Sequence, residues 1–400
     1  MSSEHNSVGR ARVATAAMFF IAGAVLATWA PHIPTVQQRL GIGPGVLGMA
    51  LLSIALGGIL AMALTGYLVH RFGSARVTRL AAVAACLWLP APVLAPSLAA
   101  LIAALLVLGA VTGMLDVAMN AQGVTVERRY SRPIMSSLHA QFSIGGLAGA
   151  GLASVLLSLG WTASEHVLTV TALMAVAAIA AGPRLLPDHG EGTAEEPQWA
   201  RPRGVLMLLG LIAVCSMLGE GAMLDWSAVY MRSEIGTGPG LAAAGFAAFS
   251  LTMTIGRLFG DALVHRLGNV AVLRIGTCLT TAGLGSALMI AHPAAALFGF
   301  ASVGIGLSNV VPIVFAASSR VPGIPPGYGL AAVSTVGYCG FLVGPPVIGF
   351  IAELTSLTLG LGLVVLCAAV IALLARHAGA ESTSMRHGAT VAQKQHEELS

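Results

Sequence analysis

Charged residues are scarce in this chain. Asp, Glu, Lys and Arg together make up 9% of the 400 residues, whereas a soluble domain carries about 25%. Hydrophobic residues account for 56%, and the mean hydropathy is +0.86. This composition excludes a water-soluble protein. The net charge of +4 is spread thinly along the chain without a basic patch, so we expect no nucleic-acid partner.

Residues for several kinds of chemistry are also missing. Lys394 is the only lysine, and no Gly-x-x-x-x-Gly-Lys-Ser/Thr loop occurs, which argues against ATP-driven transport by this chain. No residue pair has the character of a nucleophile and its base, so we expect no enzyme and no cofactor. The cysteines all lie in apolar segments without metal-ligand spacing, which indicates small buried hydrophobes and no metal site. They are Cys86, Cys215, Cys278, Cys339 and Cys367.

Long apolar segments dominate what is present. Each is about 20 residues or longer, and about 20 helical residues cross the hydrocarbon core of a bilayer. The segments are 13–31, 46–69, 77–96, 99–122, 134–158, 165–187, 204–229, 241–264, 270–291, 294–317, 328–352 and 357–375. The first is too long for the core of a signal peptide and no small-x-small cleavage site follows it. The sequence therefore predicts an all-α membrane protein with twelve transmembrane helices.

The basic residues fall almost entirely on one side of these segments. If the connections are numbered alternately, one side collects Arg10, Arg12, Arg71, Arg76, Arg79, Arg128, Arg129, Arg132, Arg184, Arg201, Arg203, Arg266, Arg274, Arg320, Arg376, Arg386 and Lys394. The other side holds only Arg39 and Arg232, and Arg257 lies within a segment. Because loops rich in Lys and Arg stay cytoplasmic, we expect a multi-pass protein of the bacterial cytoplasmic (inner) membrane with both termini cytoplasmic.

The two halves of the chain repeat each other at a constant offset of 195 residues. Gly43-Pro44-Gly45 recurs as Gly238-Pro239-Gly240, and His70-Arg71-Phe72-Gly73 recurs as His265-Arg266-Leu267-Gly268. Two halves of six helices with the same orientation form a parallel repeat. We expect an N-terminal half over 1–182, a polar cytoplasmic linker over 183–203, a C-terminal half over 204–376 and a flexible cytoplasmic tail over 377–400.

These features resemble the major facilitator superfamily. The loop that follows the second segment, Gly66 to Arg76, has the Gly-x-x-x-(acid)-Arg-x-Gly pattern, with His70 where an aspartate is usual. Within the superfamily, the stretches 116–123, 136–140 and 220–226 are similar to the bacterial YbjJ-type, fucose-permease-like subgroup. The resemblance implies two parallel six-helix halves that rock about a substrate site at the middle of the membrane.

A set of charged and glycine residues resembles the inner gate of this family. Arg257 and Asp261 lie one turn apart, so their side chains are expected to pair. The full gate set is Gly66, His70, Arg71, Gly73, Arg76, Arg257, Asp261, His265 and Arg266. These charges latch the two halves on the cytoplasmic side, or they only set the topology.

Polar residues inside the bilayer are costly and usually functional. Asp116 lies about 16 Å of helix rise from Glu127, which is close to the midplane. Gly109, Gly113, Asp116 and Asn120 share one helix face at their spacing, and we expect this face to line a central cavity. An apolar setting disfavours the ionised carboxylate, which suits proton coupling. Alternatively, neighbouring helices satisfy the acid and it has no role in transport.

Six further polar residues are candidates for the substrate and proton-coupling site. Glu220 and Asp225 lie in the seventh segment about 140° apart, so we expect them not to share a face. The others are His139, Gln141, Asn309 and Tyr338. Each has a structural alternative, as a hydrogen-bonding or packing residue between helices.

The function that follows is secondary active transport of a small polar organic solute by alternating access, with proton coupling. We expect a monomer in the lipid bilayer whose partners are its substrate and the proton. Two alternatives remain: efflux of drugs or metabolites, and a membrane sensor or assembly subunit that transports nothing.

Overall fold

The structure is a computed structural model that describes residues 2–130, 134–187, 204–322, 324 and 326–379. Within these ranges it contains helices and no strand. The helices are α1 (Ser2–Trp29), η1 (Ala30–His32), α2 (Ile33–Leu40), α3 (Pro44–Phe72), α4 (Ser74–Trp88), α5 (Pro90–Leu94), α6 (Leu98–Tyr130), α7 (Met135–Ser158), α8 (Ala163–Ala181), η2 (Gly182–Arg184), α9 (Val205–Ser233), α10 (Pro239–Leu267), α11 (Asn269–Ile290), α12 (Pro293–Leu307), α13 (Val310–Ser318), α14 (Pro326–Leu354), α15 (Leu357–Leu374) and η3 (Ala375–Gly379).

The described helices form 12 spans long and apolar enough to cross a membrane, which confirms the predicted count. Three spans are interrupted. The first continues through η1 and α2, the third divides into α4 and α5, and the tenth divides into α12 and α13 at Ser308 and Asn309. In the tenth span the cause is Pro312, whose ring clashes with the carbonyl four residues earlier in a regular helix. In contrast, α14 runs through Pro345 and Pro346 without a break.

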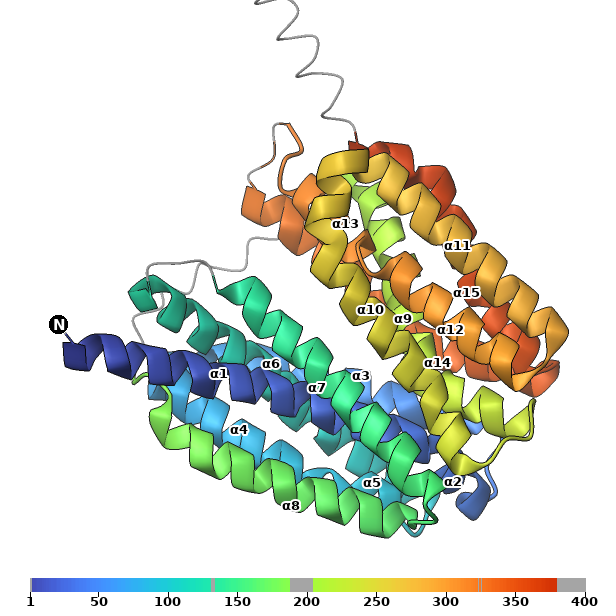
Figure 1. Ribbon diagram of the computed structural model, residues 1–400, viewed down its shortest axis with the longest axis horizontal. Helices are drawn as coiled ribbons and strands as arrows, with labels where there is room; N and C mark the ends of the chain where they lie inside the picture. Colours follow the sequence, from blue (N-terminus) through green and yellow to red (C-terminus); the bar gives the residue numbers. More distant parts are fainter. Residues whose placement is uncertain (1, 131–133, 188–203, 323, 325, 380–400) are drawn as a thin grey trace, which may run out of the picture.

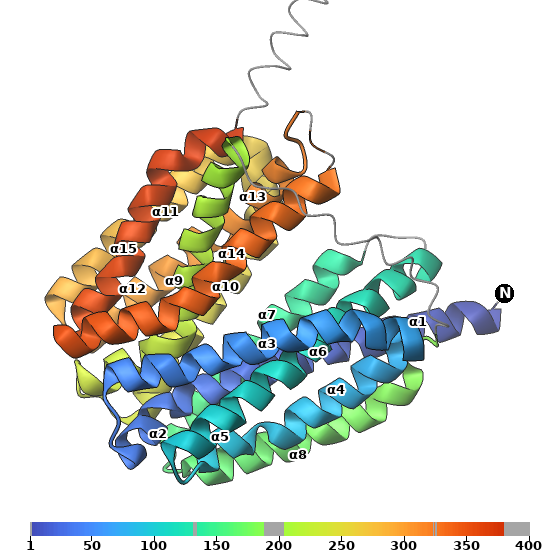
Figure 2. The ribbon, with the colours of Figure 1, turned by 180° about the vertical axis from the view of Figure 1, so that it is seen from behind.

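The spans form two bundles, α1–α8 and α9–α15, which are arranged like the arms of a V (Figure 1). The bundles meet through α3 against α14 and through α7 against α10. They separate toward the ends where α3 and α10 finish and α4 and α11 begin, and the view from behind shows the same divergence (Figure 2). These ends carry Arg71, Arg76, Arg266 and Arg376, and we call them the arginine-rich ends. The opposite ends, which carry the loops 41–43 and 234–238, form the closed end.

The sequence repeat builds the same backbone twice. Gly43 and Gly238 are the N-caps of α3 and α10, with φ/ψ of −71°/168° and −66°/163°. Both helices have 29 residues. Each ends at a glycine with positive φ, 83° at Gly73 and 81° at Gly268, a conformation that side chains with a Cβ rarely adopt. The predicted parallel six-plus-six arrangement is therefore confirmed.

Glycines bring the two bundles into contact at the closed end. A Cβ added to Gly48 would lie 2.5 Å from the Pro345 carbonyl oxygen of the other bundle, and one added to Gly349 would lie 2.6 Å from the Pro44 oxygen. The Gly45 amide donates a hydrogen bond to Glu353 Oε2 over 3.0 Å. On the other side of the molecule, Ser154 Oγ donates to the Gly240 carbonyl over 2.9 Å. Backbone therefore packs on backbone where the bundles meet.

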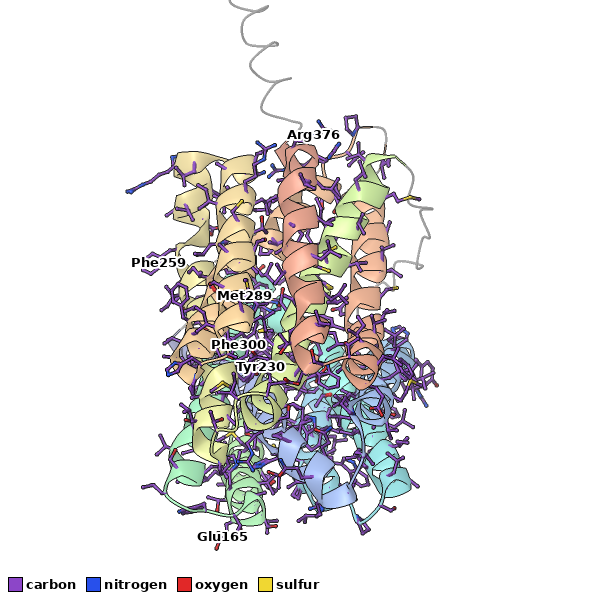
Figure 3. All side chains as sticks on the ribbon, turned by 90° about the vertical axis from the view of Figure 1, so that its right-hand side faces the viewer. Glu165, Tyr230, Phe259, Met289, Phe300 and Arg376 are labelled. Atoms are coloured by element: carbon purple, nitrogen blue, oxygen red, sulfur yellow. The ribbon has the colours of Figure 1, made fainter. Side chains whose placement is uncertain are left out.

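The outer surface of the bundles is apolar. Phe259 and Met289 project from the flank (Figure 3) and are 67% and 88% exposed. Tyr230 and Phe300 instead pack inside the bundle, edge to face at 6.1 Å between ring centroids. Such a surface fits hydrocarbon, where apolar side chains need no cover. Most of the expected linker, 188–203, and of the expected tail, 380–400, lies outside the described residues.

Candidate functional site

A central cavity of about 400 Å³ lies between the two bundles, within the usual range for small-molecule sites. Its walls come from α1, α3, α6 and α7 on one side and from α9, α10 and α14 on the other. It extends from Trp29, Leu51 and Phe246 near the closed end to Arg257 and Tyr338 toward the arginine-rich ends. The cavity is thus shared by both halves.

Asp116 lines this cavity from α6, as do Gly109 and Gly113. The glycines have a packing role as well, because a Cβ on either would overlap the backbone of α3. Asn120 is not among the described residues that line the cavity. Its Nδ2 turns back and donates to the Asp116 carbonyl at 2.8 Å and to Asp116 Oδ1 at 3.3 Å. The carboxylate therefore reaches the cavity while the amide holds its orientation.

Arg257 forms an ion pair with Glu220 inside the cavity. Arg257 Nη2 lies 3.2 Å from Glu220 Oε2, and the two side chains are 37% and 16% exposed. The expected pairing of Arg257 with Asp261 is therefore wrong in this structure. The intrahelical spacing allows that pair, but the packing of α9 against α10 offers Arg257 a carboxylate at a drier position.

Asp225 also lines the cavity from α9, together with Glu220, Gly221 and Leu224. The sequence predicts that Glu220 and Asp225 do not share a helix face, yet both line the same cavity. Their angular separation of about 140° is real, but the cavity covers a strip of α9 that is wide enough to include both, with Gly221 and Leu224 between them. Asp225 is 8% exposed and has no hydrogen-bond or ion-pair partner in the described part of the chain.

The remaining candidates are divided between the cavity and helix packing. Tyr338 lines the cavity from α14 and is 43% exposed. His139 and Gln141 lie in the first turns of α7, outside the described cavity wall, and His139 packs edge to face on Phe19 at 5.2 Å. Asn309 lies at the break between α12 and α13, where its Nδ2 donates to the Gly256 carbonyl at 3.1 Å. The structure thus places Tyr338 in the described cavity wall with the acids and leaves His139, Gln141 and Asn309 outside it.

The proposed gate residues lie on the arginine-rich ends, where the bundles are apart. The side chains of His70, Arg71, Arg76, Asp261, His265 and Arg266 are exposed. A Cβ added to Gly66 would meet nothing within 4 Å. Gly73 ends α3 through its positive φ, as described above. Of the expected gate set, Arg257 alone is placed in the cavity wall in the described structure.

One buried polar pair, His32 and His166, was not predicted from the sequence. His32 Nε2 and His166 Nδ1 lie 2.8 Å apart in a hydrogen bond that joins η1 to α8, and both rings are buried. The two histidines are 134 residues apart in the sequence, so no spacing pattern predicts the contact. Within the described ranges there is no group of three or more His, Cys, Asp or Glu side chains that could hold a metal ion.

Comparison with known proteins places this architecture in a family. The model of the Major Facilitator Superfamily matches residues 15–328, and the chain belongs to this superfamily. An uncharacterised transporter of the same type from Yersinia pestis is 42% identical over 365 residues, which cover 91% of this chain and 95% of the relative. Membrane protein MosC of Rhizobium meliloti is 33% identical over 386 residues, with 92% of each chain covered.

Solved structures share the fold at low sequence identity. The nucleoside transporter NupG superposes with a TM-score of 0.70 at 12% identity, covering 92% of this chain and 99% of NupG. The E. coli fucose:proton symporter FucP superposes with a TM-score of 0.58 at 16% identity, covering 92% and 98%. The predicted family and fold are confirmed: the chain is a multi-pass membrane transporter and not an enzyme.

Proposed function

We propose that this chain is a secondary active transporter that carries a small polar organic solute across the bacterial cytoplasmic membrane by alternating access, coupled to protons. The observation that carries the proposal is the cavity between the two halves, which holds Asp116, Asp225 and the Glu220–Arg257 pair. Intramembrane charges at such a place are expected on a substrate or ion pathway.

The alternating-access part is supported by the contrast between the two ends of the molecule. Backbone contacts between the halves at Gly48, Gly240 and Gly349 form the closed end, and the arginine-rich ends diverge (Figure 1). By the positive-inside rule the arginine-rich ends face the cytoplasm. With this orientation the structure corresponds to the inward-open state of the proposed cycle. The separation of the proposed gate residues agrees with it, since they would close the cytoplasmic side only in the outward-open state.

The proton-coupling part rests on Asp116. Its partner is the neutral amide of Asn120, whereas Glu220 is already matched by the positive charge of Arg257. A carboxylate without a cationic partner in an apolar site is stabilised by a proton. Asp116 is therefore a better proton carrier than Glu220, whose ionised form is held by the arginine.

The test is transport by purified protein in proteoliposomes. A ligand is first found by thermal stabilisation across sugars, organic acids, amino acids and amines; at about 100 times its dissociation constant it adds about 2.7 kcal/mol. The radiolabelled ligand should then accumulate against its gradient when the outside is made acidic. Exchange of the ligand without any dependence on the proton gradient would support transport and refute proton coupling.

A further inference from the structure

The charges that line the central cavity do not balance. Among the described residues that line it are three carboxylates, those of Asp116, Glu220 and Asp225, and a single cationic side chain, Arg257. Arg257 is already paired with Glu220 at 3.2 Å. Two carboxylates are therefore left without a cationic partner, and an anionic solute finds no free positive charge among the lining residues.

The two unbalanced acids differ in their surroundings. Asp116 accepts a hydrogen bond from Asn120 at 3.3 Å, so its charge has at least a dipole for a partner. Asp225 is 8% exposed and has no such partner in the described chain. A buried carboxylate without a hydrogen bond or a counter-ion is unfavourable. Because Asp225 lines the cavity, a bound ligand can supply the missing hydrogen-bond donor or positive charge.

The position of Asp225 suits a recognition group. It lies about 7.5 Å of helix rise beyond Glu220 along α9, toward the closed end, so it belongs to the blind part of the cavity. The aromatic residues Trp29, Phe246 and Phe249 line the cavity with it. Aromatic faces around a carboxylate attract organic cations, because the ring quadrupole and the negative charge act in the same direction.

We propose that Asp225 binds the protonated amine of the transported solute, and that the substrate class is small organic amines. This proposal rests on the transport function proposed above and assigns Asp225 to the substrate and Asp116 to the proton. An amine at Asp225 pairs the acid that the protein leaves unpaired. The apolar body of such a solute packs against the aromatic walls.

The experiment measures binding of probes that differ only in charge. Three skeletons (phenethyl, cyclohexylmethyl and hexose) are each tested as amine, neutral alcohol and carboxylate, by ligand-dependent thermal stabilisation of the purified full chain. The proteins are wild type, Asp225→Asn and the control Glu165→Gln, which removes an exposed acid outside the cavity and keeps a side chain that can cap α8. We expect the amine member of at least one skeleton to bind wild type, with the alcohol and the carboxylate weaker.

The variants decide whether Asp225 is responsible. The dissociation constant of the bound amine should rise by about thirtyfold or more in Asp225→Asn, the lower end of the effect of removing one partner of a buried charge pair. It should stay within about twofold of wild type in Glu165→Gln. Equal binding of the amine to Asp225→Asn and wild type, preference for the alcohol or carboxylate, or no amine binding at all would each overturn the proposal.

Failure of this inference is distinguishable from failure of the transport function. If a neutral or anionic ligand accumulates in proteoliposomes, the transport function is supported and the amine site is refuted. If an amine binds through Asp225 but never crosses the membrane, the amine site is supported and the transport function is refuted.

Discussion

The closed end offers a direct test of alternating access through Gly48. In Gly48→Ala, the new Cβ would lie 2.5 Å from the Pro345 carbonyl oxygen and 3.1 Å from the carbonyl carbon. Both atoms belong to the backbone of the opposite half, so no side chain can swing away. Overpacking of this kind costs about 1–3 kcal/mol. The clash exists only while the closed end is closed, so the full cost shifts the equilibrium toward the outward-open state by about 5- to 150-fold.

The intrinsic effect of the substitution on the helix does not disturb this estimate. Alanine favours a helix over glycine by about 1 kcal/mol, but α3 is helical in both states, so this gain cancels. The matched control is Gly151→Ala in α7, where a Cβ would meet nothing within 4 Å. It carries the same chemical change and should leave the conformational equilibrium alone.

The assay follows a cysteine inside the cavity. Ser250→Cys is nearly isosteric, lines the cavity and is 8% exposed; the native cysteines are replaced by alanine. A membrane-impermeant maleimide added to intact cells should label this cysteine about 5 to 150 times faster in Gly48→Ala than in the parent. An unchanged labelling rate in Gly48→Ala, or an equal increase in Gly151→Ala, would refute the role of Gly48 in holding the closed end together.

Three further predictions follow from the site and the topology. Asp116→Asn keeps size and hydrogen bonding but cannot carry a proton, so accumulation against a gradient should vanish while counterflow exchange persists; accumulation with the wild-type pH dependence would make Asp116 structural. A double-mutant cycle of Arg257→Leu and Glu220→Leu, followed by thermal unfolding, should give a coupling energy of about 1 kcal/mol, small because Arg257 is 37% exposed; zero coupling would mean that the pair is not formed in the membrane. In intact cells an impermeant thiol reagent should label Gln38→Cys and spare His265→Cys, and the reverse pattern would invert the topology.

The fold was largely predictable because a bilayer imposes local rules. Every spanning segment must be helical and apolar over about 20 residues, so the count of 12 follows from hydropathy alone. The repeat of Gly43 and Gly73 as Gly238 and Gly268 predicted two equivalent helices, and the backbone angles of each glycine pair agree. The interruptions were not predicted, because a proline such as Pro312 breaks its span whereas Pro345 does not.

The site was predictable only in part, because its contacts are tertiary. The depth of Asp116 can be counted along α6, and it lines the cavity. The partner of Arg257 depends on how closely α9 approaches α10, which no spacing within one helix encodes. Asn309 lies in the segment that repeats the helix of Asp116, yet it falls at the break between α12 and α13, where its amide donates to the Gly256 carbonyl.

The repeat divides the features of this protein into a backbone that both halves share and a cavity chemistry that they do not share. Backbone features occur in both copies at the same offset: the caps that begin and end α3 and α10, and the close approach of Gly109 to α3 and of Gly304 to α10. The cavity chemistry occurs once. The counterparts of Asp116 and Arg257 are Val311 and Met62, and the residues that precede the equivalent tryptophans Trp29 and Trp226 are Thr28 and Asp225. In the proposed mechanism, two like halves supply the symmetric rocking that opens either end. The charges lie at unlike positions, with Asp116 on one half and Asp225 and the Glu220–Arg257 pair on the other. Under the proposed alternating access, such a cavity would close around its ligand only when both halves contact it, and this differential contact would let binding drive the change of state.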